Sequence, residues 1–289
     1  MCIRDRHKGF DADYFNSLSE LESEKDFIMM VFDWDLAEKS EKSLKIMEAS
    51  QKTMLFVQPN NFPEPWCRHP NFMSCLDQKY IDKLNNIPNI RKWTFVEQRD
   101  SRFYDLWRGN IQTINLAYDS INYEKVKKEE VASPYDLCYV GSWANNGFDE
   151  KKKILMEYFK ALKESGLKCG IFINKGLTLE QESNLLANTK VGLNIHDNHA
   201  RILKFDTNER TFKTLGLTGM MASDNQSVIS RMFSEIDVCS NDSIGGLIDG
   251  IRGYLELPVR RIEDIKKRNR DYIMENHTYI KRVEEMLLL

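Results

Sequence analysis

The sequence predicts an α/β protein built from two doubly wound domains. Short apolar runs that suit buried strands alternate with amphipathic segments that suit helices, as in parallel sheets covered by helices. The 289 residues are long for one hydrophobic core and suit two domains of ordinary size. A charged stretch without an apolar face, residues 123–134, interrupts the alternation, so we expect a linker there.

The first β-α-β unit lies near the start of the chain. Residues 27–32 form a continuous apolar run, typical of a buried parallel strand, and Asp33 and Asp35 follow at its carboxyl end. Residues 38–49 have helical spacing, and residues 54–57 are the next apolar run. The other elements expected in this half are a helix at 11–23, a loop at 62–70, a helix at 77–84, a strand at 93–96, a helix at 101–108 and a strand at 111–118.

A second α/β series follows the charged stretch. Residues 135–140 are an apolar run, and Asp149 opens an amphipathic helix that stops at Gly166. Thr178 with Gln181 three residues later is a capping-box arrangement and predicts a helix start. The other elements expected here are strands at 169–174, 191–195, 220–222 and 236–239, and helices at 227–233, 243–255, 261–276 and 278–288.

One part of this series predicts an anion site. The apolar run at residues 191–195 ends on His196, and after a polar loop Asn208 opens a short helix that we expect Gly216 and Gly219 to close. In an α/β domain the backbone N–H groups and the positive end of such a helix face the carboxyl ends of the strands. We therefore expect the functional centre here.

The composition excludes several classes of protein. Hydrophobic residues make up 42% of the chain and charged residues 29%, as in a globular protein, and the formal charge of −3 argues against a nucleic-acid binder. The basic runs 151–153 and 266–268 lie on amphipathic helices, and we interpret them as solvated faces. No apolar run approaches the roughly 20 residues of a membrane span.

The six cysteines are scattered and form no C-x-x-C pair, which fits free thiols in a reducing cytoplasm. Cys67, His69 and Cys75 lie close together in the sequence but lack a fourth ligand and a metal-site spacing, so we expect no metal there. The opening residues 1–6 resemble an assembly scar from environmental sequencing. We exclude them and expect the first domain to be incomplete at its N-terminus.

Several segments of the second half occur together in a familiar order: residues 136–142, residues 193–196, residues 210–212 with Gly216 and Gly219, and residues 277–287. This ordered set resembles the C-terminal domain of CgeB-like (spore-maturation type) glycosyltransferases, which have the GT-B fold. The resemblance covers residues 135–289, whereas the first half resembles the family only in layout.

The resemblance implies two Rossmann-like domains that face each other across a cleft. Residues 7–122 would form the acceptor-side domain, residues 123–134 the linker, residues 135–258 the donor-binding domain, and residues 259–289 helices that brace both. The implied partners are a nucleotide-diphosphate sugar, used as co-substrate, and an acceptor that is a glycan, a protein or a small molecule. The family typically needs no metal or other cofactor, because helix N-termini and basic side chains hold the diphosphate.

Gly141 and Ser142 match the family's glycine-rich turn, where a missing Cβ lets the backbone approach a phosphate. A tight turn without a ligand is the alternative. Trp143 could stack on a base or pack in the protein. Arg210 matches the family's arginine and suits a diphosphate, unless it pairs with Asp206 or another nearby acid.

Lys213 departs from the family, which usually has a glutamate here that accepts hydrogen bonds from the ribose hydroxyls. An ammonium group can only donate. Glu209 lies one turn earlier and could pair with Lys213. Three readings stay open: Glu209 takes over ribose binding, Lys213 contacts phosphate, or donor binding is lost. The resemblance also assigns donor contacts to Thr211 and Gly216.

His196 and Asp197 follow a strand, where catalytic groups of α/β proteins tend to lie. His196 could orient the donor, or a backbone carbonyl could satisfy it, and Asn194 has a structural role. An inverting reaction needs a general base from the first domain. Asp33, Asp35 and His69 are candidates by position, although each also fits an ordinary strand-end or loop residue.

The sequence therefore predicts a cytoplasmic, metal-independent glycosyltransferase. A non-catalytic binding protein of a surface-polysaccharide or spore-coat system is the alternative that Lys213 favours. A nucleotide-sugar epimerase of related fold is a third hypothesis.

Overall fold

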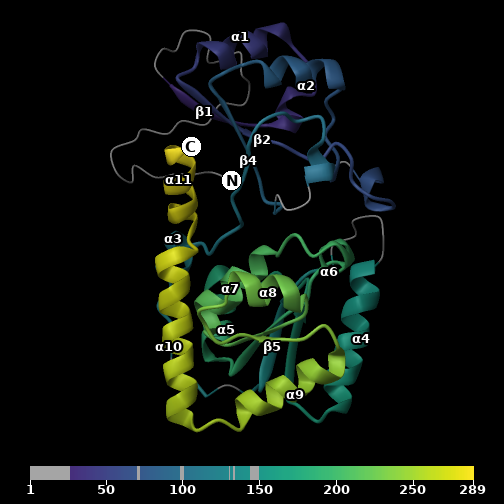
Figure 1. Ribbon diagram of the computed structural model, residues 1–289. Helices are drawn as coiled ribbons and strands as arrows, with labels where there is room; N and C mark the ends of the chain where they lie inside the picture. Colours follow the sequence, from purple (N-terminus) through teal and green to yellow (C-terminus); the bar gives the residue numbers. More distant parts are fainter. Residues whose placement is uncertain (1–26, 70–71, 98–100, 130, 133, 144–149) are drawn as a thin grey trace. The chain divides into compact units, whose positions relative to one another are not determined.

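The computed structural model describes residues 27–69, 72–97, 101–129, 131–132, 134–143 and 150–289. The chain divides into two compact units. The first comprises Met1–Thr94 and Asp100–Thr113, and the second comprises Phe95–Arg99 and Ile114–Leu289. Figure 1 labels the elements of both units.

The first unit contains a parallel sheet of four strands in the order β1-β2-β3-β4. Its strands are β1 (Ile28–Phe32), β2 (Lys52–Phe56), β3 (Ile90–Thr94) and β4 (Ile111–Thr113). Its described helices are η3 (Asp33–Leu36), α1 (Glu41–Ala49), η4 (Trp66–Arg68), α2 (Gln78–Asn85) and η6 (Ser101–Tyr104). Apolar side chains such as Leu55, Met47 and Ile81 are fully buried, which is why the sequence shows unbroken apolar runs here.

The second unit contains a parallel sheet of five strands in the order β6-β5-β7-β8-β9. Its strands are β5 (Leu137–Gly141), β6 (Cys169–Ile173), β7 (Val191–Asn194), β8 (Met221–Ser223) and β9 (Cys239–Ser240). Its described helices are α3 (Ser120–Tyr123), α4 (Glu150–Glu164), α5 (Leu179–Asn188), α6 (Asn198–Leu203), α7 (Glu209–Thr218), α8 (Gln226–Met232), α9 (Ile244–Leu255), α10 (Val259–Asn276) and α11 (Tyr279–Leu288).

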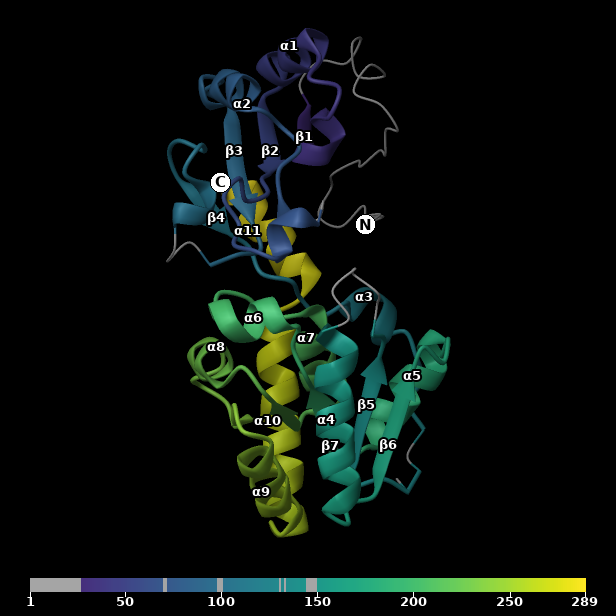
Figure 2. The ribbon, with the colours of Figure 1, turned by 90° about the vertical axis from the view of Figure 1, so that its right-hand side faces the viewer.

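Helices cover both faces of the second sheet (Figure 2). Leu155 of α4 and Ile251 of α9 belong to one buried cluster with residues of β5 and β7. Phe212 of α7, Leu186 of α5 and Ile273 of α10 belong to the other. The sheet thus has a core on each face, as the prediction of a doubly wound domain requires.

The order of strands places a topological switch point beside β5. The chain passes from β5 to β6 on one side of it, and then to β7 on the other side. In open α/β sheets, ligands bind in the crevice at the carboxyl ends of the strands that flank such a point.

The two C-terminal helices form as expected and break at His277. Tyr118 forms an isolated bridge with Thr278, supported by hydrogen bonds from Tyr118 N to His277 O (2.8 Å) and from Tyr279 N to Tyr118 O (3.2 Å). The segment predicted as a linker contacts α5, since the N–H groups of Glu129 and Val131 donate to side chains of that helix.

Several expected elements need correction. The strand expected at 93–96 lies earlier, at Ile90–Thr94, and the strand expected at 236–239 begins only at Cys239. The strand expected at 111–118 ends at Thr113, and the helix expected at 101–108 is only a short 3-10 turn. The loop expected at 62–70 contains a 3-10 turn at Trp66–Arg68. The helix expected at 11–23 and the helix start at Asp149 lie outside the described residues. In the part of the chain that is described, no helix is long and apolar enough to cross a membrane.

Candidate functional site

The N-terminus of α7 is capped by Asn208, as the sequence predicts. The Asn208 side chain accepts a hydrogen bond from Thr211 N at 3.1 Å, which satisfies one of the free N–H groups of the first turn. The helix ends at Gly219, whose φ of +74° favours glycine. A Cβ there would also lie 2.4 Å from the carbonyl oxygen of Lys266.

Gly216 does not close this helix, contrary to our expectation. It lies inside α7, where a Cβ would come within 2.7 Å of the Tyr118 ring. Because glycine is small, the helix can pack on Tyr118 at this position. Gly216 therefore has a packing role and does not end the helix.

A buried polar network joins the end of β7 to α7. His196 is fully buried, with Nδ1 2.6 Å from Asp224 Oδ1 and Nε2 2.8 Å from Thr207 Oγ1. Thr207 in turn hydrogen-bonds Thr211, which is also buried and accepts from Asn194. A carboxylate and a hydroxyl satisfy His196, rather than the backbone carbonyl that we considered. The network holds the loop before α7 in place, and Asn194 has the structural role predicted for it.

Arg210 reaches from α7 to the switch point of the sheet. Its Nε donates to Val140 O at 2.9 Å, and its Nη1 donates to Ile195 O at 3.4 Å, so the guanidinium lies across the ends of β5 and β7. It also lies 4.7 Å from the centre of the buried Tyr139 ring. Among the described residues no carboxylate is within ion-pair distance of Arg210, and its Nη2 donates to none of them.

The predicted alternative of an ion pair between Arg210 and Asp206 is therefore wrong. Burial raises the pKa of Asp206 to about 7, so that carboxyl group is a poor counter-ion near neutral pH.

Gly141 is the residue that makes room for this arginine. A Cβ at Gly141 would lie 2.4 Å from Arg210 Nη2. The space that we expected to admit a phosphate thus contains the guanidinium itself. Ser142, the next residue, is exposed, and Trp143 is half-buried with the Lys152 ammonium 5.6 Å from its ring centre.

Lys151 is a second cation at this point, and the sequence did not single it out. We interpreted residues 151–153 as a solvated face. That is right for Lys152 and Lys153 but wrong for Lys151, which is only 6% exposed. Its Nζ donates to Ile195 O at 2.7 Å and lies 3.2 Å from Asp197 Oδ1. Burial lowers the pKa of Lys151 to about 8, an effect that Asp197 partly offsets.

The cation site can therefore be defined by three groups: Arg210, Lys151 and the N-terminus of α7. Both side chains donate to the carbonyl oxygen of Ile195, although they come from helices about 60 residues apart in the sequence. A periodicity search could have flagged Lys151, because it falls on the apolar face of its helix with Ile154, Leu155 and Tyr158.

Lys213 pairs with Glu182. The pair with Glu209 that the helical spacing allows does not form. The Lys213 Nζ donates to Glu182 Oε1 at 2.6 Å, and the other oxygen of that carboxylate accepts from Tyr123 OH at 2.9 Å. Burial and the nearby Glu182 raise the pKa of Tyr123. Glu209 is exposed and accepts a hydrogen bond from Tyr279 OH at 3.1 Å.

The three acid–base candidates of the first unit differ in their surroundings. Asp33 is buried and accepts from Gln58 N at 3.1 Å, and burial raises its pKa to about 6. Asp35 is exposed, and its Oδ2 accepts from Phe32 N at 3.0 Å. His69 is half-buried, with its ring 5.5 Å from that of Phe72. The raised pKa of Asp33 is typical of a group that takes up protons near neutral pH.

Within the described ranges, no group of three or more His, Cys, Asp or Glu side chains is placed to hold a metal ion. The cysteines in those ranges are free: Cys67, Cys75, Cys138, Cys169 and Cys239.

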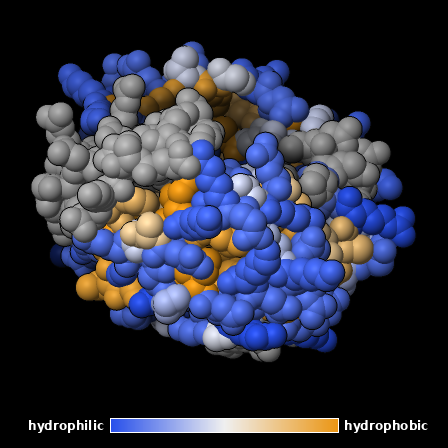
Figure 3. Space-filling model, turned by 90° about the horizontal axis from the view of Figure 1, so that it is seen from above, coloured by the Kyte–Doolittle hydropathy of each residue, from blue (hydrophilic) through white to orange (hydrophobic). Residues whose placement is uncertain are grey.

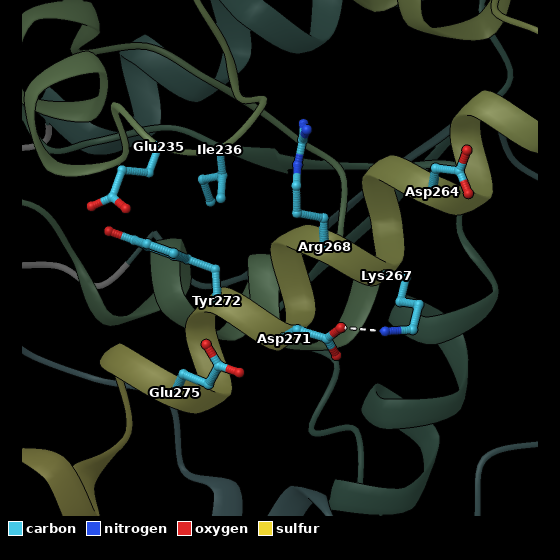
Figure 4. A pocket seen from close by; sticks show the side chains of 8 residues that line it. All are labelled: Glu235, Ile236, Asp264, Lys267, Arg268, Asp271, Tyr272 and Glu275. Carbon is cyan, nitrogen blue, oxygen red and sulfur yellow. Dashed lines mark hydrogen bonds and ion pairs between the residues drawn. The ribbon is translucent and has the colours of Figure 1, made fainter.

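An open hollow of about 420 Å³ beside α10 is separate from the cation site (Figure 4). It is lined by Glu235, Ile236, Asp264, Lys267, Arg268, Asp271, Tyr272 and Glu275. Its two cations are already paired, Lys267 with Asp271 and Arg268 with Asp237. It shares no residue with the cation site, so we assign it no role in ligand binding there.

Comparisons with known proteins fit this architecture. The model of a family described as glycosyl transferase-like matches residues 151–288, which include Lys151, the buried network and α7. None of the curated protein sequences matches the chain.

Solved structures resemble the chain over 94% of its length. The N-terminal domain of a trehalose-6-phosphate phosphatase from Candida albicans is 11% identical, with a TM-score of 0.57 and 72% of that chain covered. TarM of S. aureus, in complex with UDP, is 12% identical, with a TM-score of 0.56 and 57% of that chain covered. An E. coli structure described as trehalose-6-phosphate bound with UDP-2-fluoro glucose is 8% identical, with a TM-score of 0.59 and 76% of that chain covered.

The chain has a GT-B-like fold. The two Rossmann-like parallel sheets of the sequence prediction are confirmed, and at these identities the structural likeness establishes the GT-B fold alone. Within that fold, the cation site lies at the switch point of the second sheet, in the half of the chain that the glycosyl transferase-like family matches.

Proposed function

We propose that this protein is a glycosyltransferase whose second unit binds a nucleotide-diphosphate sugar at the cation site. The observation that carries the proposal is the environment of Arg210. Backbone carbonyls at the ends of β5 and β7 hold its guanidinium, and no described carboxylate forms an ion pair with it. A cation at a helix N-terminus is unfavourable for the helix alone, which favours an anionic ligand as its missing partner. The family match, the UDP bound in one of the similar structures and the UDP-2-fluoro glucose bound in another support a nucleotide sugar.

In the proposed reaction the bond between the anomeric carbon and the diphosphate oxygen breaks, and that oxygen leaves with the electron pair. The oxygen of an acceptor hydroxyl forms the new bond to the anomeric carbon and gives up its proton. In an inverting reaction the proton goes to a base of the first unit, for which Asp33 is our candidate; in a retaining reaction the departing diphosphate takes it. Arg210, Lys151 and the N–H groups of α7 stabilise the charge on the leaving group, so the proposal requires no metal.

The remaining donor contacts follow from the geometry of α7. Glu209, in the first turn, is exposed and keeps acceptor capacity beyond its bond to Tyr279, so we assign the ribose hydroxyls to it. Glu182 neutralises Lys213, which argues against a phosphate contact for that lysine.

The other residues predicted for the donor site would have supporting roles. Gly141 and Ser142 would form the turn next to the diphosphate. His196, Thr211 and Gly216 would act by holding α7 in place, because all three are buried.

Calorimetric titration with UDP and with GDP tests the donor site. Arg210→Ala should weaken nucleotide binding about ten- to a hundredfold, since hydrogen bonds to charged groups contribute about 1.5–3 kcal/mol. Arg260→Ala is the matched control, because Arg260 is exposed on α10 and outside the site. The donor site does not exist if the folded wild-type protein binds none of UDP, GDP, UDP-sugars and GDP-sugars.

The alternative function is a non-catalytic binding protein, and the Lys213–Glu182 pair favours it, because the pair puts a cation where the family has a ribose-binding acid. A direct Lys213→Glu exchange would place two carboxylates together. The double exchange Lys213→Glu with Glu182→Lys keeps an ion pair and restores the acid on α7. A non-catalytic protein should gain nucleotide affinity from the double exchange. In an active enzyme the nucleotide affinity should be unchanged or weaker, and transfer of labelled sugar is the second measurement.

The third hypothesis, an epimerase, is separated by product analysis with labelled donor, because an epimerase would alter the donor without any acceptor.

Two finer assignments belong to this proposal. The ordered set of motifs favours the CgeB-like type within the glycosyltransferases. The free thiols of the described cysteines favour a reducing compartment, so we place the protein in the cytoplasm.

A further inference from the structure

An exposed tryptophan marks the carboxyl end of β1 in the first unit. Trp34 lies in the 3-10 turn that follows β1, and its side chain is 45% exposed. On the face seen in Figure 3, hydrophilic side chains surround smaller hydrophobic areas. Trp34 is one of the large hydrophobic side chains that remain exposed among the described residues.

Other aromatic rings fix the position of this indole. Trp34 stacks on Phe32 with ring centres 4.5 Å apart and an angle of 12° between the planes. Both rings contact Phe56 at 5.4 Å, and Phe56 packs edge-on against the buried Trp93 at 4.9 Å. Trp34 is therefore held on a rigid aromatic base while much of its surface stays open, and it loses little freedom when a ligand binds.

Two polar groups of this turn have no described partner. The Trp34 Nε1–H donates to none of the described residues. Phe32 N occupies Oδ2 of Asp35, which leaves Oδ1 of this exposed carboxylate without a described partner. The turn thus offers an apolar face, a donor and an acceptor on two consecutive residues of the chain, Trp34 and Asp35.

We propose that Trp34 is the platform for a sugar ring of the acceptor, with Asp35 accepting a hydrogen bond from one of its hydroxyls. A pyranose ring presents C–H groups on one face and hydroxyls around its edge, which matches this combination of groups. The inference rests on the proposed function and makes it more specific: the acceptor contains a carbohydrate.

The charges near Trp34 exclude the donor as its occupant. The buried Asp33 and the exposed Asp35 precede and follow Trp34 in the chain, and no cation forms an ion pair with either among the described residues. Carboxylates repel the phosphates of a nucleotide, whereas they accept hydrogen bonds from neutral hydroxyls. An acyl chain would use the ring but neither polar group.

Saturation-transfer NMR and affinity titrations with maltotriose, cellotriose and chitotriose test the platform. Octanoate serves as the apolar probe, and UDP binding is measured in parallel. Trp34→Ala should weaken binding of the best trisaccharide about tenfold, the factor expected when an indole-sized apolar contact is lost. Trp34→Phe should have a smaller effect, and Asp35→Asn should weaken sugar binding without affecting octanoate.

The matched control is Val259→Ala, which removes an exposed apolar side chain of α10 and should change neither affinity. UDP affinity should be equal in all these variants. The platform is disproved if UDP binds but no trisaccharide does, if Trp34→Ala and Trp34→Phe both bind sugar as well as the wild type, or if octanoate alone depends on Trp34. Loss of UDP binding in the wild-type protein would instead contradict the proposed function.

Discussion

At the scale of single residues, neighbours decide what a charged side chain can do. Lys151, Lys152 and Lys153 are consecutive and chemically identical, yet only Lys151 points into the protein and reaches Ile195 O. Adjacent side chains on a helix point about 100° apart, so three consecutive lysines cannot all face the solvent side of an amphipathic helix equally. Burial then lowers the pKa of Lys151 to about 8, so its charge changes with pH in the mildly alkaline range.

The pH dependence of nucleotide binding should reveal Lys151. Above a pH of about 8 the free protein loses the Lys151 proton, so UDP affinity should fall, by up to about tenfold per pH unit if only the protonated form binds. Below that pH the affinity should be constant down to the range in which phosphate itself takes up a proton, near pH 6. Calorimetry between pH 7 and about 9.5 measures the effect.

In Lys151→Met the affinity should be low and constant over this pH range. Lys152→Met is the control, because Lys152 is exposed on the same helix and should keep the wild-type profile. A wild-type profile in Lys151→Met would show that Lys151 does not contact the ligand.

At the scale of elements, α7 connects the fold to the site. Asn208 caps it, Thr211 ties it to the network beneath β7, and Arg210 extends from its first turn to the switch point. On its other side, Gly216 allows Tyr118 to pack, and Gly219 allows the backbone of α10 to approach. The position of Arg210 therefore depends on a helix that is fixed along its whole length.

Removing the cap should loosen this helix. Asn208→Ala should lower the free energy of unfolding by about 1 kcal/mol, because Thr211 N loses its side-chain acceptor. Urea unfolding measures this loss, and UDP affinity should fall with it if α7 carries the site. Asn208→Asp keeps an acceptor oxygen and should retain the stability. Equal unfolding energies for the Ala and Asp variants would mean that the cap contributes nothing.

At the scale of the whole molecule, His277 links distant parts of the second unit. It ends α10, its carbonyl accepts from Tyr118 N, and its Nδ1 lies 2.7 Å from Arg282 Nη2. Its ring also contacts Phe212 and Phe233. Burial, with a contribution from Arg282, lowers the pKa of His277 to about 4.

Stability should therefore depend on His277 in acid. Between its ordinary pKa of 6.5 and about 4, the unfolded chain binds a proton there that the folded chain does not. The free energy of unfolding should then fall as the pH is lowered through this window, and the contribution is fully present above pH 6.5. In His277→Phe the slope of stability against pH should be smaller by one proton. Urea unfolding at several pH values measures both slopes, and equal slopes would rule out the assignment.

Much of the architecture could be predicted from the sequence because it depends on local pattern. The apolar runs of β1 and β5, the Asn208 cap and the Thr178–Gln181 capping box form as expected. Each of these depends on residues within one or two turns of each other, whose chemistry can be interpreted without a partner. The same patterns also pointed to α7 as the anion-binding element.

Tertiary structure decided which charges remain available. Glu182 pairs with Lys213 from 31 residues away, Lys151 meets Arg210 at Ile195 O, and Gly141 admits the guanidinium of an arginine 69 positions later in the chain. The contact between Trp34, in the turn after β1, and Phe56 of β2 likewise joins separate segments of the chain. The sequence by itself determined the two sheets and α7, the helix that we propose as the ligand-binding element. Only the folded chain determined that Lys151 pairs with Asp197 whereas Arg210 forms no ion pair with a described carboxylate, because charges interact through space between segments that no local pattern connects.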